Sequence, residues 1–73
     1  MEKIHTGRFV VVNSSNSVEL RLASGGILAT FSSNAELAVL NGNIIQVNLK
    51  TGQVVFYKLT NDGYSVTGPY LSL

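Results

Sequence analysis

Short clusters of Gly, Asn and Ser interrupt this chain about every 8–10 residues, and this spacing constrains the fold more than any other feature. The clusters are NSSNS (13–17), SGG (24–26), SSNAE (32–36), NGN (41–43), TG (51–52) and NDG (61–63). The runs between them are rich in Val, Ile, Thr, Phe and Tyr, the residues that favour a pleated, half-buried surface. Such runs are typical of short antiparallel strands joined by tight turns.

The spacing predicts about seven strands in one domain, residues 1–73, with residues 1–7 as a flexible N-terminal tail. The expected strands are Arg8–Val12, Val18–Ala23, Ile27–Ser32, Ala35–Leu40, Ile44–Lys50, Gln53–Thr60 and Tyr64–Leu71. One segment has an alternative, because Asn34 is a good helix cap and Glu36 would lie in the first turn of a helix over 34–40. The expected fold class is all-β, an antiparallel meander that forms a small sandwich or an open barrel.

Loop lengths predict which side chains share a face, since a slip of one residue moves every side chain to the opposite face. A two-residue Gly25-Gly26 turn puts one set on a common face: Leu20, Leu22, Ala29 and Phe31. The opposite face then carries Glu19, Arg21, Thr30 and Ser32. A three-residue loop at 41–43 pairs Val39 with Ile45, Leu37 with Val47 and Ala35 with Leu49.

The stretch NIIQVNLKTGQVVFYKL (43–59) has one alternating arm and one arm that is apolar on both faces. A two-residue Thr51-Gly52 turn predicts an inner face of Ile45, Val47, Leu49, Val54 and Phe56. It leaves Val55, Tyr57 and Leu59 on the outside, beside Gln46, Asn48 and Lys50. Burying a side chain of this size is worth about 1.5–3 kcal/mol. We therefore expect Val55, Tyr57 and Leu59 to form a subunit interface.

Size supports the same expectation of a homo-oligomer. A chain of 73 residues is near the lower limit for a self-sufficient core, and such chains are commonly reinforced by disulfides, a metal or association. Cys is absent, and a single His with four carboxylates makes a metal site improbable. Association is the remaining means of stabilisation, and no cofactor is expected.

The sequence offers little for catalysis. Nucleophilic catalysis needs a Ser, Thr or Cys beside a base, and the only His, His5, lies in the expected tail. The serines cluster in turns, where their hydroxyl groups bond to nearby backbone. SGG lacks the Lys and the helix of a phosphate-binding loop. We expect a protein that is not an enzyme.

Charge and hydropathy restrict the partners. Charged residues make up 12% of the chain and the net charge is +1, so strong steering towards nucleic acid or an anionic membrane is not expected. No apolar run approaches the ~18 residues of a membrane span, and the N-terminus has no signal-peptide pattern. The cytoplasm is the default location, with a viral particle as the alternative.

Nucleic acid remains an alternative partner, because exposed aromatic side chains and a few cations on a sheet bind single strands. The candidate contacts are Arg8, Lys50, Lys58 and Tyr57. A ring or dimer of subunits would multiply one or two cations per chain into a continuous basic track.

The layout resembles the trp RNA-binding attenuation proteins over most of the chain. The resemblance is carried by FVVV (9–12), VEL (18–20), TFSSNAEL (30–37) and GNIIQV (42–47). It implies small meander subunits that form a ring, bind tryptophan between subunits and wrap single-stranded RNA. The Lys-x-Arg pair that contacts RNA in the family is not matched, since the later strands offer only residues 46–48 or 57–59. The family's lysine shortly before a Leu is not matched either, since Glu36 stands near its place.

Together these features predict a non-enzymatic β module that acts as a homo-oligomeric binding or structural protein. One alternative is a ring or dimer that binds single-stranded RNA or DNA. The other is a viral or carbohydrate-binding surface module, which the abundance of Ser, Asn and Gly with low charge suggests.

Overall fold

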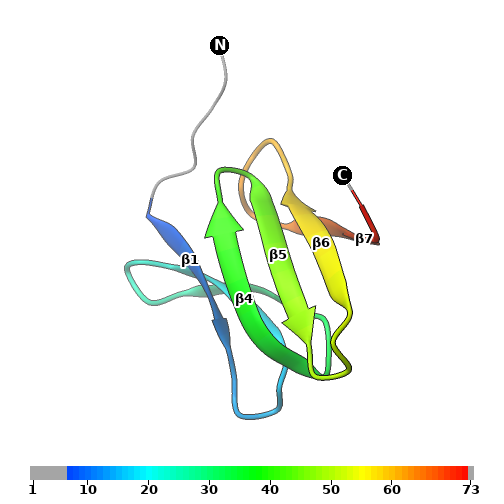
Figure 1. Cartoon of the computed structure of the whole chain (residues 1–73). Helices are drawn as coiled ribbons and strands as arrows, with labels where there is room; N and C mark the ends of the chain where they lie inside the picture. Colours follow the sequence, from blue (N-terminus) through cyan, green and yellow to red (C-terminus); the bar gives the residue numbers. More distant parts are fainter. Residues whose placement is uncertain (1–6, 73) are drawn as a thin grey trace.

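The computed structural model describes residues 7–72, which form seven antiparallel strands (Figure 1). The strands are β1 (Arg8–Val12), β2 (Val18–Leu22), β3 (Ile27–Phe31), β4 (Ala35–Asn41), β5 (Ile44–Leu49), β6 (Val54–Leu59) and β7 (Val66–Tyr70). The predicted all-β class is confirmed, and the segment that had a helical alternative is strand β4. Within residues 7–72 no helix is long and apolar enough to cross a membrane.

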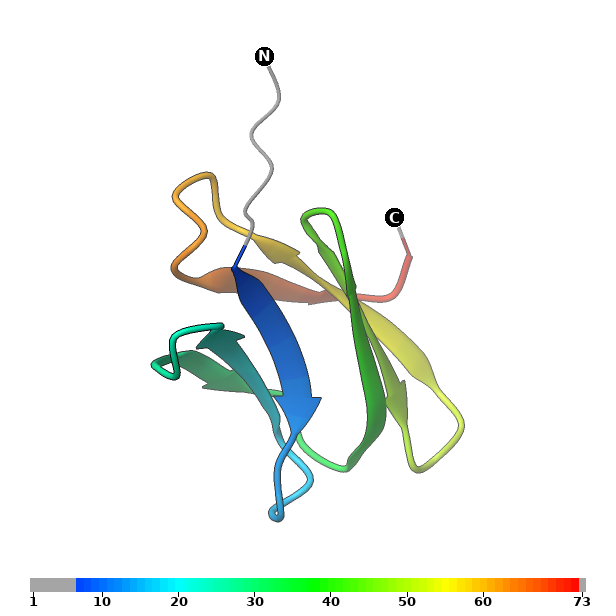
Figure 2. The same cartoon turned by 90° about the vertical axis from the view of Figure 1, so that its left-hand side faces the viewer.

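The strands form two sheets, each a meander in chain order. β1, β2 and β3 form a three-stranded sheet, and β4, β5, β6 and β7 form a four-stranded sheet. Figure 2 shows the two sheets inclined towards each other, with β1 crossing beside β4. Over the described residues they do not close into a barrel, so the arrangement is that of a small sandwich or open barrel.

The predicted tail (1–7) lies outside the described residues except for Gly7. The carbonyl oxygen of Gly7 accepts a hydrogen bond of 2.6 Å from the backbone N–H of Ala23. Gly7 is therefore held against the end of β2 and belongs to the fold.

Three of the hairpins turn through the same three-residue loop. In each, the N–H of the residue before the loop donates to the carbonyl of the residue after it: Asn13 to Ser17, Leu22 to Gly26 and Leu49 to Gln53, all at 2.8 Å. The last loop residue, which is Asn16, Gly25 or Gly52, has a positive φ. This is the three-residue hairpin loop in which a turn is followed by a left-handed residue, and it explains why Asn or Gly stands at that position.

These loop lengths correct the predicted pairing of β2 with β3. The Gly25-Gly26 turn was expected to pair Leu20 with Phe31, but Leu20 pairs with Ala29 and Val18 pairs with Phe31. The three-residue loop alone shifts the pairing by three residues, which would reverse a face, but a bulge between Leu20 and Arg21 reduces the shift to two, so the predicted faces remain correct. Glu19 and Thr30 share the outside face, as expected, and they pair with each other there.

The β5–β6 pairing differs from the prediction by one residue, which reverses a face. Val47 pairs with Val55 and Ile45 pairs with Tyr57, because the loop comprises Lys50, Thr51 and Gly52 and not Thr51-Gly52 alone. Val55, Tyr57 and Leu59, which were expected outside, therefore point inwards. Val54 and Phe56, which were expected inside, point outwards.

The β4–β5 loop is also one residue different from the expectation. Asn41 pairs with Ile44, so the loop comprises Gly42 and Asn43 only, with φ of 62° at Gly42. Val39 then lies opposite Gln46 and Leu37 opposite Asn48, where Ile45 and Val47 were expected. The expected Ala35–Leu49 pair does form, because a bulge between Ala35 and Leu37 restores the register.

The core lies between the two sheets and draws most of its buried residues from β5 and β6. Its fully or nearly fully buried members are Val18, Leu20, Ala35, Ile45, Val47, Val55, Tyr57 and Leu59. The rings of Phe31 and Tyr57 meet across the sheets with their centroids 4.6 Å apart and their planes inclined at 53°. This contact joins the edge strand of one sheet to an interior strand of the other.

Candidate interaction surface

Val55, Tyr57 and Leu59, the residues expected to form a subunit interface, are only 6–7% exposed in the single chain. They face the core beside Ile45 and Val47. The expectation depended on the register that the structure corrects, and these three side chains have almost no surface to offer a neighbour. Any apolar contact surface has to be sought on the other side of the same sheet.

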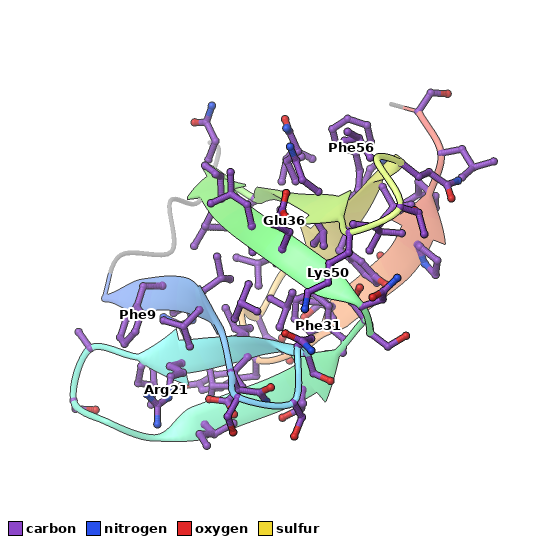
Figure 3. All side chains as sticks on the ribbon, turned by 60° about the horizontal axis from the view of Figure 1, so that its bottom comes forward. Phe9, Arg21, Phe31, Glu36, Lys50 and Phe56 are labelled. Atoms are coloured by element: carbon purple, nitrogen blue, oxygen red, sulfur yellow. The ribbon has the colours of Figure 1, made fainter. Side chains whose placement is uncertain are left out.

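That other side, which we call the outer face, consists of the side chains of β4–β7 that point away from the core. The register arranges them in three rows across the strands. The rows are Leu37, Asn48 and Val54, then Val39, Gln46, Phe56 and Tyr70, and finally Asn41, Ile44, Lys58 and Thr67. Figure 3 shows Phe56 on this face and Phe31 on the opposite side, between the sheets.

Apolar side chains dominate the outer face. Leu37 is 52% exposed, Val39 is 47% exposed and Tyr70 is 38% exposed, while Ile44, Val54 and Phe56 are half-buried. Four of these six residues come from β4 and β6, on either side of the more polar strand β5. Isolated apolar residues on a surface are ordinary, but a contiguous apolar patch is typical of an interaction site.

A shallow depression of about 380 Å³ lies in the middle of the outer face. It is lined by Val39, Asn41, Ile44, Gln46 and Phe56, none of which is charged. The amide of Gln46 donates from Nε2 to Asn48 Oδ1 at 3.0 Å, so the polar groups of β5 partly satisfy each other. The surface is accordingly suited to contact with another neutral, largely apolar surface.

One aromatic and cationic cluster occupies the β7 side of the outer face. The ammonium group of Lys58 lies 5.2 Å from the centroid of the Tyr70 ring. Tyr70 pairs with Phe56 across the strands, and its hydroxyl donates to Thr67 Oγ1 at 3.2 Å. A cation over an aromatic ring in partly exposed surroundings is worth about 0.5–1 kcal/mol.

The four candidate nucleic-acid contacts are not brought together. Tyr57 is buried, and Arg8 lies at the start of β1, where its Nε donates to the carbonyl of Gly63 at 2.6 Å. Lys50 follows the end of β5, whereas Lys58 pairs with Ile44 at the beginning of that strand, so the two lysines lie at opposite ends of the hairpin. Arg8 and Lys58 each lie beside an accessible aromatic ring, Tyr64 and Tyr70, but these two rings belong to different contacts.

Groups suited to chemistry are sparse in the described part of the chain. No three His, Cys, Asp or Glu side chains of residues 7–72 form a group that could hold a metal ion. Glu19 accepts from Asn13 Nδ2 at 2.9 Å and lies 3.4 Å from Arg21 Nε, while Asp62 Oδ1 accepts from Thr60 Oγ1 at 2.6 Å in the β6–β7 turn. Each of these carboxylates serves a local turn or strand contact.

The outer face was not predicted because two loops each differ by one residue from the expectation: the β4–β5 loop misplaced Leu37 and Val39, and the β5–β6 loop misplaced the residues of β6. The apolar residues of β6 form an uninterrupted run, so the sequence alone permits either of its two alternating sets of side chains to face the core. The signal that decides between them is Gly52, which fits the left-handed last position of a three-residue loop beginning at Lys50. With that loop, Val55 and Tyr57 face the core, and Val54 and Phe56 lie on the outer face.

Comparison with known proteins finds no family model, no curated protein and no solved structure that matches the chain.

Proposed function

We propose that this protein is a non-enzymatic, homo-oligomeric binding or structural module whose copies meet through the outer face of β4–β7. The observation that carries the proposal is the apolar surface formed by Leu37, Val39, Ile44, Val54, Phe56 and Tyr70 on one side of a single sheet. The chain is small, and these side chains are apolar groups that its own core leaves uncovered.

The energetics favour covering this face. Complete burial of a side chain such as Leu or Val recovers about 1.5–3 kcal/mol, and Leu37 and Val39 are about half exposed, so each stands to gain roughly half of that. The face carries one cation, Lys58, whose charge is already placed over Tyr70. Two copies packed face to face would therefore bury few unpaired charges.

Substitution of Val39 tests this proposal. Val39→Lys puts a charge in the middle of the outer face, where the side chain already reaches solvent, so the chain should fold normally but associate more weakly. Light scattering should show a lower particle mass for this variant than for the wild type, and 1 M salt should not dissociate the wild type, because apolar contacts are not screened.

Thr51→Lys is the matched control, since Thr51 is an exposed residue of the β5–β6 turn, away from the outer face. It should leave the mass unchanged. An unchanged mass for Val39→Lys in a folded protein would remove the outer face as the contact.

A second candidate function is binding of single-stranded nucleic acid, which the Lys58, Tyr70 and Phe56 cluster supports. A base can stack on an exposed ring while a neighbouring ammonium group contacts phosphate. In a ring, as the resemblance to the attenuation proteins implies, such clusters would repeat from subunit to subunit.

The cluster predicts salt-sensitive retention on a heparin column that Lys58→Gln reduces. Lys50→Gln removes the same charge at the far end of the hairpin and should have less effect. Equal effects of both variants would indicate nonspecific charge attraction and exclude the cluster as a site.

A further inference from the structure

The free sheet edges differ in how well they are protected. The end strands are β1 and β3 in one sheet and β4 and β7 in the other. β1 and β4 lie beside each other, and the N–H of Ala35 at the start of β4 donates to the carbonyl of Asn16 at 2.8 Å. The edges of β1 and β4 therefore lie along the seam between the sheets (Figure 2). β3 and β7 are left at the outside.

β7 carries features that discourage pairing, and the second half of β3 does not. Pro69 has no N–H to give a neighbouring strand, and Gly68 is pressed against β6, so a side chain at this position would meet Tyr57. β3 reads ILATF and contains no charged residue, no Pro and no Gly. Proteins normally protect an exposed edge with charges, Pro or a bulge.

β3 has one bulge, which is confined to its first half. The register with β2 shifts between Ile27 and Ala29, whereas Ala29, Thr30 and Phe31 are paired regularly with Leu20, Glu19 and Val18. The regular part offers an extended backbone whose outward N–H and C=O groups have no strand partner within the described chain. A strand of matching shape is the natural partner for such an edge.

We infer that β3 pairs antiparallel with β3 of a second copy around Thr30, so that two three-stranded sheets become one sheet of six strands. The two-fold arrangement places Thr30 opposite Thr30 of the other copy and Ala29 opposite Phe31. Thr–Thr pairs are favourable across strands, and a small residue beside a large one avoids crowding on the inner side, where Phe31 already contacts Tyr57.

Charges do not oppose this pairing. Glu19, the neighbour of Thr30 on β2, forms an ion pair with Arg21 at 3.4 Å. In the joined sheet the two copies of Glu19 would be three strand spacings apart, about 14 Å. That separation exceeds the ~8 Å over which charges act at physiological salt.

The β3 edge is a contact surface separate from the outer face, and it adds contact where the area of the outer face is small. Four strands about 4.8 Å apart and some six residues long present roughly 400 Å² in projection, whereas a stable interface takes about 800 Å² from each partner. A contact through the outer face is therefore small on its own. The inference shares with the proposed function only the second copy, and it uses a different surface.

Disulfide cross-linking of single-cysteine variants tests the inference, because the chain has no Cys of its own. Thr30→Cys replaces an exposed side chain, and under mild oxidation it should give a covalent dimer of twice the chain mass. Thr51→Cys, an exposed position in the β5–β6 turn and away from the outer face, is the matched control. Directly opposed thiols have an effective concentration in the millimolar range, so at ~100 μM protein Thr30→Cys should cross-link about tenfold faster than Thr51→Cys.

Equal rates for the two variants would overturn the edge pairing. The same measurement in the Val39→Lys background separates the two surfaces. Rapid cross-linking of Thr30→Cys that persists in the Val39→Lys background supports pairing through the β3 edge without a contribution from the outer face. A particle mass that falls with Val39→Lys, together with equal cross-linking rates at positions 30 and 51, keeps the outer face and rejects the edge.

Discussion

Gly68 is the residue whose identity the fold most strictly requires. It lies on β7 with a φ of 133°, a conformation that side chains rarely adopt. A Cβ at this position would lie 2.9 Å from Tyr57 Cδ2 and 3.0 Å from the carbonyl oxygen of Phe56. Both neighbours belong to β6, and one of them is backbone, so neither can move freely.

Gly68→Ala should therefore lower the free energy of unfolding by more than backbone strain alone. Gly25→Ala is the matched control, because Gly25 also has a positive φ, 116°, but open space around it. Overpacking in a close contact typically costs about 1–3 kcal/mol, and urea unfolding followed by circular dichroism should show that difference between the two variants. Equal losses would mean that β7 does not approach β6 as closely as described.

At the scale of elements, the β5–β6 hairpin decides which side of the larger sheet is core. Its three-residue loop, Lys50–Gly52, puts Val55 in the core and Val54 on the outer face. The two valines are adjacent and chemically identical, so they report the register directly.

Val55→Asp should abolish the fold or cost at least about 3 kcal/mol, since an unpaired carboxylate would be placed in a buried site. Val54→Asp should fold, because its side chain is only half-buried and can reach water. One-dimensional NMR or circular dichroism distinguishes the outcomes. A folded Val55→Asp protein with an unfolded Val54→Asp protein would restore the opposite register.

The strands could be predicted from the sequence far better than the faces. Turn residues mark where strands begin and end, and β1 was predicted with its observed bounds, Arg8–Val12. Faces depend on loop length to the residue, and SGG, NGN and TG each permit loops of two or three residues. At Gly25 a bulge between Leu20 and Arg21 offset the loop error and preserved the faces, whereas at Gly52 an error of one residue misplaced the candidate surface.

At the scale of the whole molecule, a contact from Arg8 ties the two sheets together. Its Nε donates to the carbonyl of Gly63 at 2.6 Å, and its guanidinium lies 4.9 Å from the centroid of the Tyr64 ring. Arg8 begins β1, while Gly63 and Tyr64 belong to the β6–β7 turn. The contact therefore joins the first strand of the smaller sheet to the last turn of the larger one.

Arg8→Ala should destabilise the chain by about 1.5–3 kcal/mol, the usual worth of a hydrogen bond from a charged group. Arg8→Lys keeps the charge but has no Nε donor, so it should recover only part of the loss. Tyr64→Ala removes the ring alone and should cost about 0.5–1 kcal/mol. These differences are measurable by urea unfolding, and an Arg8→Ala protein as stable as the wild type would show that the sheets hold together without this contact.

Self-association is the central claim, because the outer face and the β3 edge both assign a second copy to surfaces that one chain leaves open. Sedimentation equilibrium of the wild-type protein at ~100 μM tests it most directly. We predict a particle of at least twice the 7.8 kDa chain mass that persists in 1 M salt. A well-folded particle of 7.8 kDa at that concentration would contradict the account.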